Sequence, residues 1–157
     1  MAAGGEGLTR AEQMLLALLY APGRSRPPAE PLVGRVNLVK LLFLLWKNPV
    51  TGPALRDEID FEPYDYGPYS EWVDVALSEL DSRDLVTQEA GRPTRIALTR
   101  KGLRKGRAAF EALSDEERGV VEDVKESFGH LSTAALLERI YAAYPDYATA
   151  SKWRRTG

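Results

Sequence analysis

The chain has 157 residues, 44% hydrophobic and 28% charged, which is typical of one globular domain large enough to bury its own core. It contains no cysteine, which excludes disulfides, a thiolate nucleophile and cysteine-ligated zinc. Its formal net charge of −2 excludes a general electrostatic attraction to nucleic acid or to anionic lipid.

Helices are expected in the first third of the chain. Thr9 and Glu12 have the spacing of a capping box, which predicts a helix from there to about Tyr20. The proline-rich segment 21–31 is expected to be a surface loop. A second helix, predicted over residues 34–47, is apolar on nearly every side and should be the most buried element. Segment 51–60 leaves open whether a short helix forms.

Segment 61–85 is expected to nucleate the fold. Its first twelve residues hold five aromatic side chains: Phe61, Tyr64, Tyr66, Tyr69 and Trp72. Aromatic residues bury the most area per side chain, and Gly67-Pro68 predicts a tight turn among them. The helix predicted next, over about 69–83, has one apolar face formed by Val73, Ala76, Leu77 and Leu80.

A β-hairpin and three further helices are predicted after that helix. The hairpin strands are expected at 85–88 and 94–98, around a turn that carries Gly91. Thr99 should cap a helix, Ser114 and Glu117 form a second capping box, and Ser132 or Thr133 should start the last helix. The inward residues of these helices are expected to be Leu103, Gly106, Phe110 and Leu113, then Val121, Val124 and Phe128, and then Leu136, Leu137, Ile140 and Tyr141.

The order helix, helix, helix, β-hairpin is that of a winged helix. We therefore expect a mainly α fold with a small β-hairpin: a winged helix-turn-helix over residues 9–113, with a C-terminal helical extension over 114–157. The apolar residues of the extension must be buried, so it should either cover the core or mediate a homodimer.

Three motifs, YDYGPYS at 64–70, LSELDSRDLV at 77–86 and IALTRKG at 96–102, occur in this order. Together they resemble the Panacea antitoxin domain and related winged-helix proteins of bacteria and archaea, and the likeness covers about residues 38–151. The resemblance implies a non-enzymatic regulatory module that binds either DNA or a partner protein. It supplies no catalytic residues.

DNA binding is the first functional hypothesis. The candidate recognition helix exposes mainly acidic and hydroxyl side chains, which phosphates would repel, so phosphate contacts are expected from the hairpin and the next helix instead. The candidate residues are Arg92, Arg95, Arg100, Lys101, Arg104, Lys105 and Arg107. The alternative is a solvated helix face neutralised by the acidic segment 111–126. If these cations form one exposed face continuous with the hairpin, DNA binding is favoured; if segment 111–126 neutralises them, a protein partner is favoured.

Protein binding is the second hypothesis. An acidic helix beside exposed aromatic rings could bind a basic partner. The candidate residues are Tyr64, Tyr66, Tyr69, Trp72, Glu71 and Asp74. The alternative is that the aromatic residues pack in the core around the Gly67-Pro68 turn.

Enzyme chemistry is not expected. His130 is the only histidine and has no acid or nucleophile at a diagnostic spacing, and no phosphate loop, dinucleotide motif or zinc-protease motif occurs. Glu58, Asp60 and Glu62 alternate along an extended segment and would share a face, which makes a weak cation site conceivable, although a solvated edge is favoured. We expect no cofactor and no structural metal.

A cytoplasmic location without a membrane partner is also expected. The first residues lack a signal-peptide pattern. The longest apolar run, residues 38–46, is far shorter than the roughly 20 residues that cross a bilayer.

Overall fold

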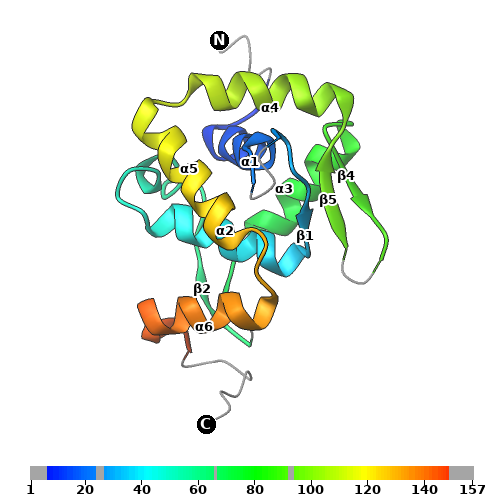
Figure 1. Cartoon of the computed structure of the whole chain (residues 1–157). Helices are drawn as coiled ribbons and strands as arrows, with labels where there is room; N and C mark the ends of the chain where they lie inside the picture. Colours follow the sequence, from blue (N-terminus) through cyan, green and yellow to red (C-terminus); the bar gives the residue numbers. More distant parts are fainter. Residues whose placement is uncertain (1–6, 24–26, 66, 92–93, 149–157) are drawn as a thin grey trace.

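The computed structural model describes residues 7–23, 27–65, 67–91 and 94–148, and within them the protein is mainly helical with small antiparallel sheets (Figure 1). This confirms the expected mainly α class. The α-helices are α1 (Arg10–Tyr20), α2 (Arg35–Lys47), α3 (Glu71–Ser82), α4 (Arg100–Ala112), α5 (Asp115–Phe128) and α6 (Thr133–Ala143). Two 3₁₀ turns are η1 (Gly52–Ala54) and η2 (Pro145–Ala148). The strands are β1 (Leu32–Val33), β2 (Glu62–Tyr64), β3 (Gly67–Tyr69), β4 (Val86–Glu89) and β5 (Arg95–Leu98).

Helix starts follow the local signals in the sequence. Thr9 and Ser114 each form the predicted capping box, with Glu12 and Glu117 respectively. The side chains of Thr99 and Ser132 also cap their helices, α4 and α6. These caps satisfy amide groups that no residue within the helix can reach, so each fixes where its helix begins.

The predicted hairpin forms one edge of a three-stranded sheet. Strands β4 and β5 pair antiparallel, and β1 pairs with the other side of β5, which gives the order β1-β5-β4. Strand β1 was not predicted: it has only two residues, and its partner Ile96 lies far along the chain from Leu32.

The prediction of a tight turn at Gly67-Pro68 is wrong. These residues form strand β3, which pairs with β2 in a second small hairpin, with Pro68 opposite Pro63. Gly67 has a φ of +91°, a conformation that side chains strongly disfavour. The ammonium group of Lys40 on α2 donates to the carbonyl oxygen of Pro68 in this strand at 2.9 Å.

Helix α4 crosses α1 through small residues, and this corrects the inner face expected for it. Gly106 is buried as expected, together with Gly102 and Ala109, whereas Leu103 is 39% exposed. A Cβ atom at Gly106 would lie 3.1 Å from the carbonyl oxygen of Leu16, so the two helix backbones approach too closely for a larger side chain. Phe110 and Leu113 pack only partly buried at the edge of the core.

Hydrogen bonds join the start of α4 to the segment that follows α3, at the base of the β4–β5 hairpin. The amide of Thr99 donates to the carbonyl oxygen of Leu85 at 3.1 Å, and its hydroxyl donates to that of Asp84 at 2.6 Å. The ammonium group of Lys101 donates to the carbonyl oxygen of Arg83 at 3.3 Å.

The C-terminal helices cover the core. Val121 and Val124 of α5, and Leu136 and Ile140 of α6, belong to the same apolar cluster as α1 and α2, while Phe128 is partly buried. Of the two roles expected for the extension, covering the core is therefore observed, and dimerisation stays a prediction. Its last nine residues, 149–157, lie outside the described residues. None of the described helices combines the length and the apolar character that a membrane crossing requires.

Candidate functional site

The predicted DNA-binding cations fall into two places on the molecule. Arg92 lies outside the described residues, and Arg95 is exposed on β5, where it pairs across the strands with Glu89. The others lie on α4: Arg100, Lys101, Arg104 and Arg107 are exposed and Lys105 is half-buried. Helix α4 begins at the base of the hairpin, at the end away from its turn (Figure 1). The cations of α4 are therefore separated from the hairpin turn by the length of β5.

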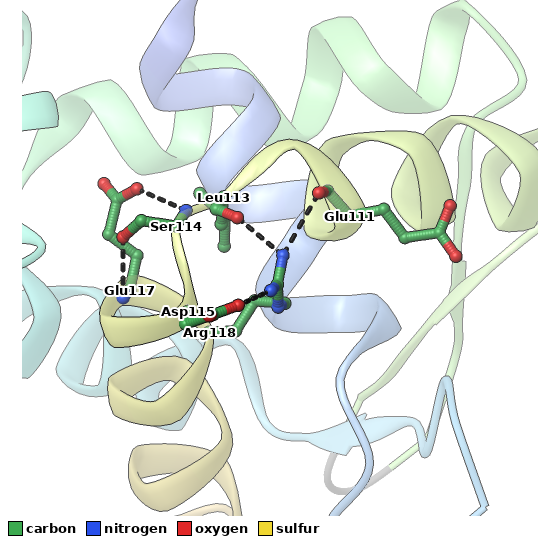
Figure 2. Close-up of polar contacts among 6 residues, drawn as sticks. All are labelled: Glu111, Leu113, Ser114, Asp115, Glu117 and Arg118. Carbon is green, nitrogen blue, oxygen red and sulfur yellow. Dashed lines mark hydrogen bonds and ion pairs between the residues drawn. The ribbon is translucent and has the colours of Figure 1, made fainter.

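Within the acidic segment 111–126, Arg118 bonds to groups of the segment itself. Figure 2 shows Arg118 at the corner between α4 and α5, where its guanidinium donates to the carbonyl oxygens of Leu113 at 2.6 Å and Glu111 at 3.1 Å and pairs with Asp115. Among the predicted cations, Arg107 forms an ion pair with this segment, to Glu111 at 3.1 Å. Arg95, Arg100 and Arg104 keep exposed charges.

The solvent face of α3 is acidic. Glu71, Ser78, Glu79, Asp81 and Ser82 are exposed along it. Asp74 is engaged: it accepts hydrogen bonds from the Tyr69 hydroxyl at 2.5 Å and from Arg35 on α2 at 2.9 Å. The bond to Asp74 raises the pKa of Tyr69 to about 12. Val75 is 62% exposed among these acids.

The aromatic residues of segment 61–72 separate into core and surface. Phe61 packs in the core, with its ring centroid 5.5 Å from that of Phe43. Tyr64 is 52% exposed and packs on Tyr69, with 5.2 Å between ring centroids. Trp72 is partly buried. Tyr66 lies outside the described residues. The partner-binding hypothesis therefore keeps Tyr64, Tyr69 and Trp72 at the surface, next to the acidic face of α3.

A pocket of about 350 Å³ lies where segment 58–62 meets the start of α3. It is lined by Glu58, Asp60, Phe61, Glu62, Tyr69, Ser70, Glu71 and Trp72. Glu58, Asp60 and Glu62 therefore do share one face, as their alternation predicts. Within the described ranges, however, no group of three acidic or histidine side chains is placed to hold a metal ion.

A second pocket, of about 600 Å³, lies between the start of α2 and the turn from α5 to α6. His130 lines it and is exposed, with its Nδ1 3.1 Å from the carbonyl oxygen of Glu126. Asn37, buried beneath, is bonded on both sides: it donates to Leu131 and accepts from Thr133.

Two contributors to these surfaces were missed by sequence reasoning. Arg35 pairs with Asp74 across 39 positions, and no local spacing signals such a contact. Ser70 precedes α3 where a capping residue is expected, but its side chain makes no cap hydrogen bond. The sequence alone cannot show that a serine in a capping position leaves its hydroxyl without a cap hydrogen bond.

Comparison of the sequence with protein-family models and with curated proteins finds no match.

Proposed function

We propose that the chain is a non-enzymatic regulatory protein with a winged-helix fold, and that the face of α3 binds a basic partner protein. The fold proposal is supported by the order of α1, β1, α2, α3, β4 and β5, with η1 and the β2–β3 hairpin inserted between α2 and α3, and by the strand order β1-β5-β4. In this arrangement β4–β5 would be the wing and α3 would be the recognition helix.

The acidic charge of α3 favours a protein partner over DNA. A duplex against this helix would bring phosphates close to Glu71, Glu79 and Asp81, all exposed, and the repulsion would be strongest at low salt. A basic protein surface would instead be attracted. Tyr64 is an exposed aromatic residue of the kind that anchors protein interfaces, and Val75 adds exposed apolar surface. Binding of a partner protein is one of the two roles that the Panacea resemblance implies.

The experiment is affinity capture from the source cells with quantitative mass spectrometry. We expect one basic protein to be captured by the wild type and lost with Val75→Ser/Glu79→Lys. A matched control, Val36→Ser/Glu126→Lys, changes one exposed valine and one exposed glutamate elsewhere and should retain it. A capture pattern identical for the two double variants would refute a partner site on α3.

DNA binding remains the second candidate, favoured by the exposed charges of Arg95, Arg100 and Arg104. It predicts that duplex DNA binds with a strong salt dependence in a fluorescence-anisotropy titration. In an Arg95→Ala/Arg100→Ala/Arg104→Ala variant, the slope of log K against log salt should flatten by about one unit per cation removed. No binding at low salt would eliminate this candidate.

A further inference from the structure

We propose that the pocket beside α3 binds a cationic side chain, arginine or lysine, of the partner protein. This inference rests on the proposed function and gives the partner a specific chemistry. The name acidic pocket is used below for the cavity lined by Glu58, Asp60, Phe61, Glu62, Tyr69, Ser70, Glu71 and Trp72.

The charge of the acidic pocket selects for a cation. Four of its eight lining residues are carboxylates, and none of the lining residues that the structure describes is a lysine or an arginine. Within a concave site the surrounding protein screens charge less than open water does, so a cation entering there is attracted more strongly than at a flat surface. A guanidinium carries five donors in a fixed plane and can bond to several carboxylate oxygens together.

The walls of the acidic pocket are aromatic as well as acidic. Phe61, Tyr69 and Trp72 line it, and the faces of such rings attract ammonium and guanidinium groups. Two of these rings are held by hydrogen bonds: the Tyr69 hydroxyl donates to Asp74, and the Trp72 indole donates to Glu58 at 2.9 Å. A ligand therefore meets rings that are already oriented, which lowers the entropy lost on binding.

Glu58 retains an oxygen for a ligand. Its Oε2 accepts from the Trp72 indole at 2.9 Å and from the Thr9 hydroxyl at 2.8 Å. Both bonds use the same oxygen, so Oε1 has no donor within the part of the chain that the structure describes. The carboxylate is thus fixed in position with one oxygen unoccupied.

Ser70 provides a second, independent observation that favours a ligand in this pocket. It lines the acidic pocket and is only 3% exposed, and its hydroxyl has no hydrogen-bond partner within the described ranges. Buried hydroxyls are nearly always bonded, because an unsatisfied one loses its hydration without compensation. An N–H donor of an entering side chain would satisfy this oxygen.

The ligand is an organic cation rather than a metal ion. The carboxylates line a cavity of about 350 Å³ without forming a group that could hold a metal, and aromatic rings make up much of its wall. Metal ions in proteins prefer clustered oxygen ligands, whereas rings and separated carboxylates suit a broad, flat cation.

The test is an NMR titration of the full-length ¹⁵N-labelled chain with N-acetyl-arginine amide, and with N-acetyl-citrulline amide as its neutral isostere. The indole N–H signal of Trp72, assigned with Trp72→Phe, should shift saturably with the arginine probe only. The indole signal of Trp46, which donates to the carbonyl oxygen of Ile59, is the internal reference. In Glu62→Gln/Glu71→Gln the affinity should fall about tenfold or more, while Glu79→Gln, outside the pocket, should match the wild type.

Three results of the titration and one of the partner capture would overturn the proposal. The first is the absence of a saturable Trp72 shift, and the second is an equal response to the citrulline probe. The third concerns the chain's own cations at 152, 154 and 155: binding seen only in Lys152→Gln/Arg154→Gln/Arg155→Gln would assign the pocket to this segment instead of a partner. Partner capture that survives Glu62→Gln/Glu71→Gln but is lost with Val75→Ser/Glu79→Lys would overturn the pocket alone and leave the proposed function intact.

Discussion

The ammonium group of Lys125 on α5 donates a hydrogen bond to the carbonyl oxygen of Leu19, 2.8 Å away and 106 positions earlier in the chain. It also donates to the carbonyl oxygen of Ala21 at 2.7 Å. These oxygens lie at the end of α1, where carbonyl groups lack partners within the helix and where the helix dipole favours a positive charge. A lysine that is only 1% exposed therefore ties the extension to the central helix.

Stability should rise with pH because of this lysine. Burial lowers the pKa of Lys125 from 10.5 to about 7, against a smaller opposing effect of Glu30. Between these values the unfolded chain binds the proton and the folded chain has released it, so raising the pH favours the folded state. We expect Lys125→Met to remove up to about 1 kcal/mol per pH unit of this rise between pH 7 and 9.

Urea unfolding of both proteins at pH 6, 7, 8 and 9 measures this difference. Burial also lowers the pKa of Lys40, to about 8, so the Lys125→Met profile should keep part of the slope. Parallel profiles for the two proteins would contradict the prediction.

Two glycines in helices should respond oppositely to alanine. A Cβ atom at Gly102 would lie 1.8 Å from the carbonyl oxygen of Leu85, whereas one at Gly119 would have no neighbour within 4 Å. Gly102→Ala should lower the free energy of unfolding by about 1–3 kcal/mol through overpacking, and Gly119→Ala should raise it by roughly 0.5–1 kcal/mol through helix propensity. Chemical denaturation of both variants gives the comparison, and equal signs would be inconsistent with the close approach of α4.

Arg118 should stabilise the corner between α4 and α5 more than a surface arginine does. Its guanidinium, 30% exposed, bonds to two carbonyl oxygens as well as to Asp115. Arg118→Met should lower the free energy of unfolding by about 1–2 kcal/mol. The control Arg107→Met removes an ion pair whose arginine side chain is 66% exposed and should leave the urea midpoint unchanged. Equal effects would show that the carbonyl contacts contribute nothing.

The exposure of Leu103 can be tested in the same way. Because its side chain lies outside the contact between α4 and α1, Leu103→Ser should change the free energy of unfolding by no more than about 0.5 kcal/mol. Leu16→Ala, in the fully buried face of α1, should lower it by about 2–5 kcal/mol. A large loss with Leu103→Ser would restore the inner face that helical periodicity predicts.

Local sequence signals predicted the helices well because their causes are local. Thr9 with Glu12 and Ser114 with Glu117 complete their hydrogen bonds within four residues. The spacing of these residues in the sequence is therefore enough to predict the helix start. The choice of inner face on α4 was different. Periodicity identifies apolar positions, but whether Leu103 or Gly106 faces α1 depends on how closely the two helix backbones approach.

Contacts between distant segments could not be predicted in this way. Strand β1 exists because Leu32 and Val33 meet β5, and neither residue carries a strand signal strong enough alone. The acidic pocket could be predicted only in part from the sequence, because the alternation of Glu58, Asp60 and Glu62 predicts that they share a face. The unsatisfied hydroxyl of Ser70 and the bond from Trp72 to Glu58 required the fold.

The bonds that link the amide and the hydroxyl of Thr99 to Leu85 and Asp84 also bear on the kinetics of recognition. They join the start of α4 to the segment between α3 and β4, so we expect α3 and the β4–β5 hairpin to move together. A ligand that touches both should therefore associate in a single step, without a slow rearrangement of the protein before or after the encounter. Differences in affinity among ligands of this surface should then appear mainly in how long each complex lasts.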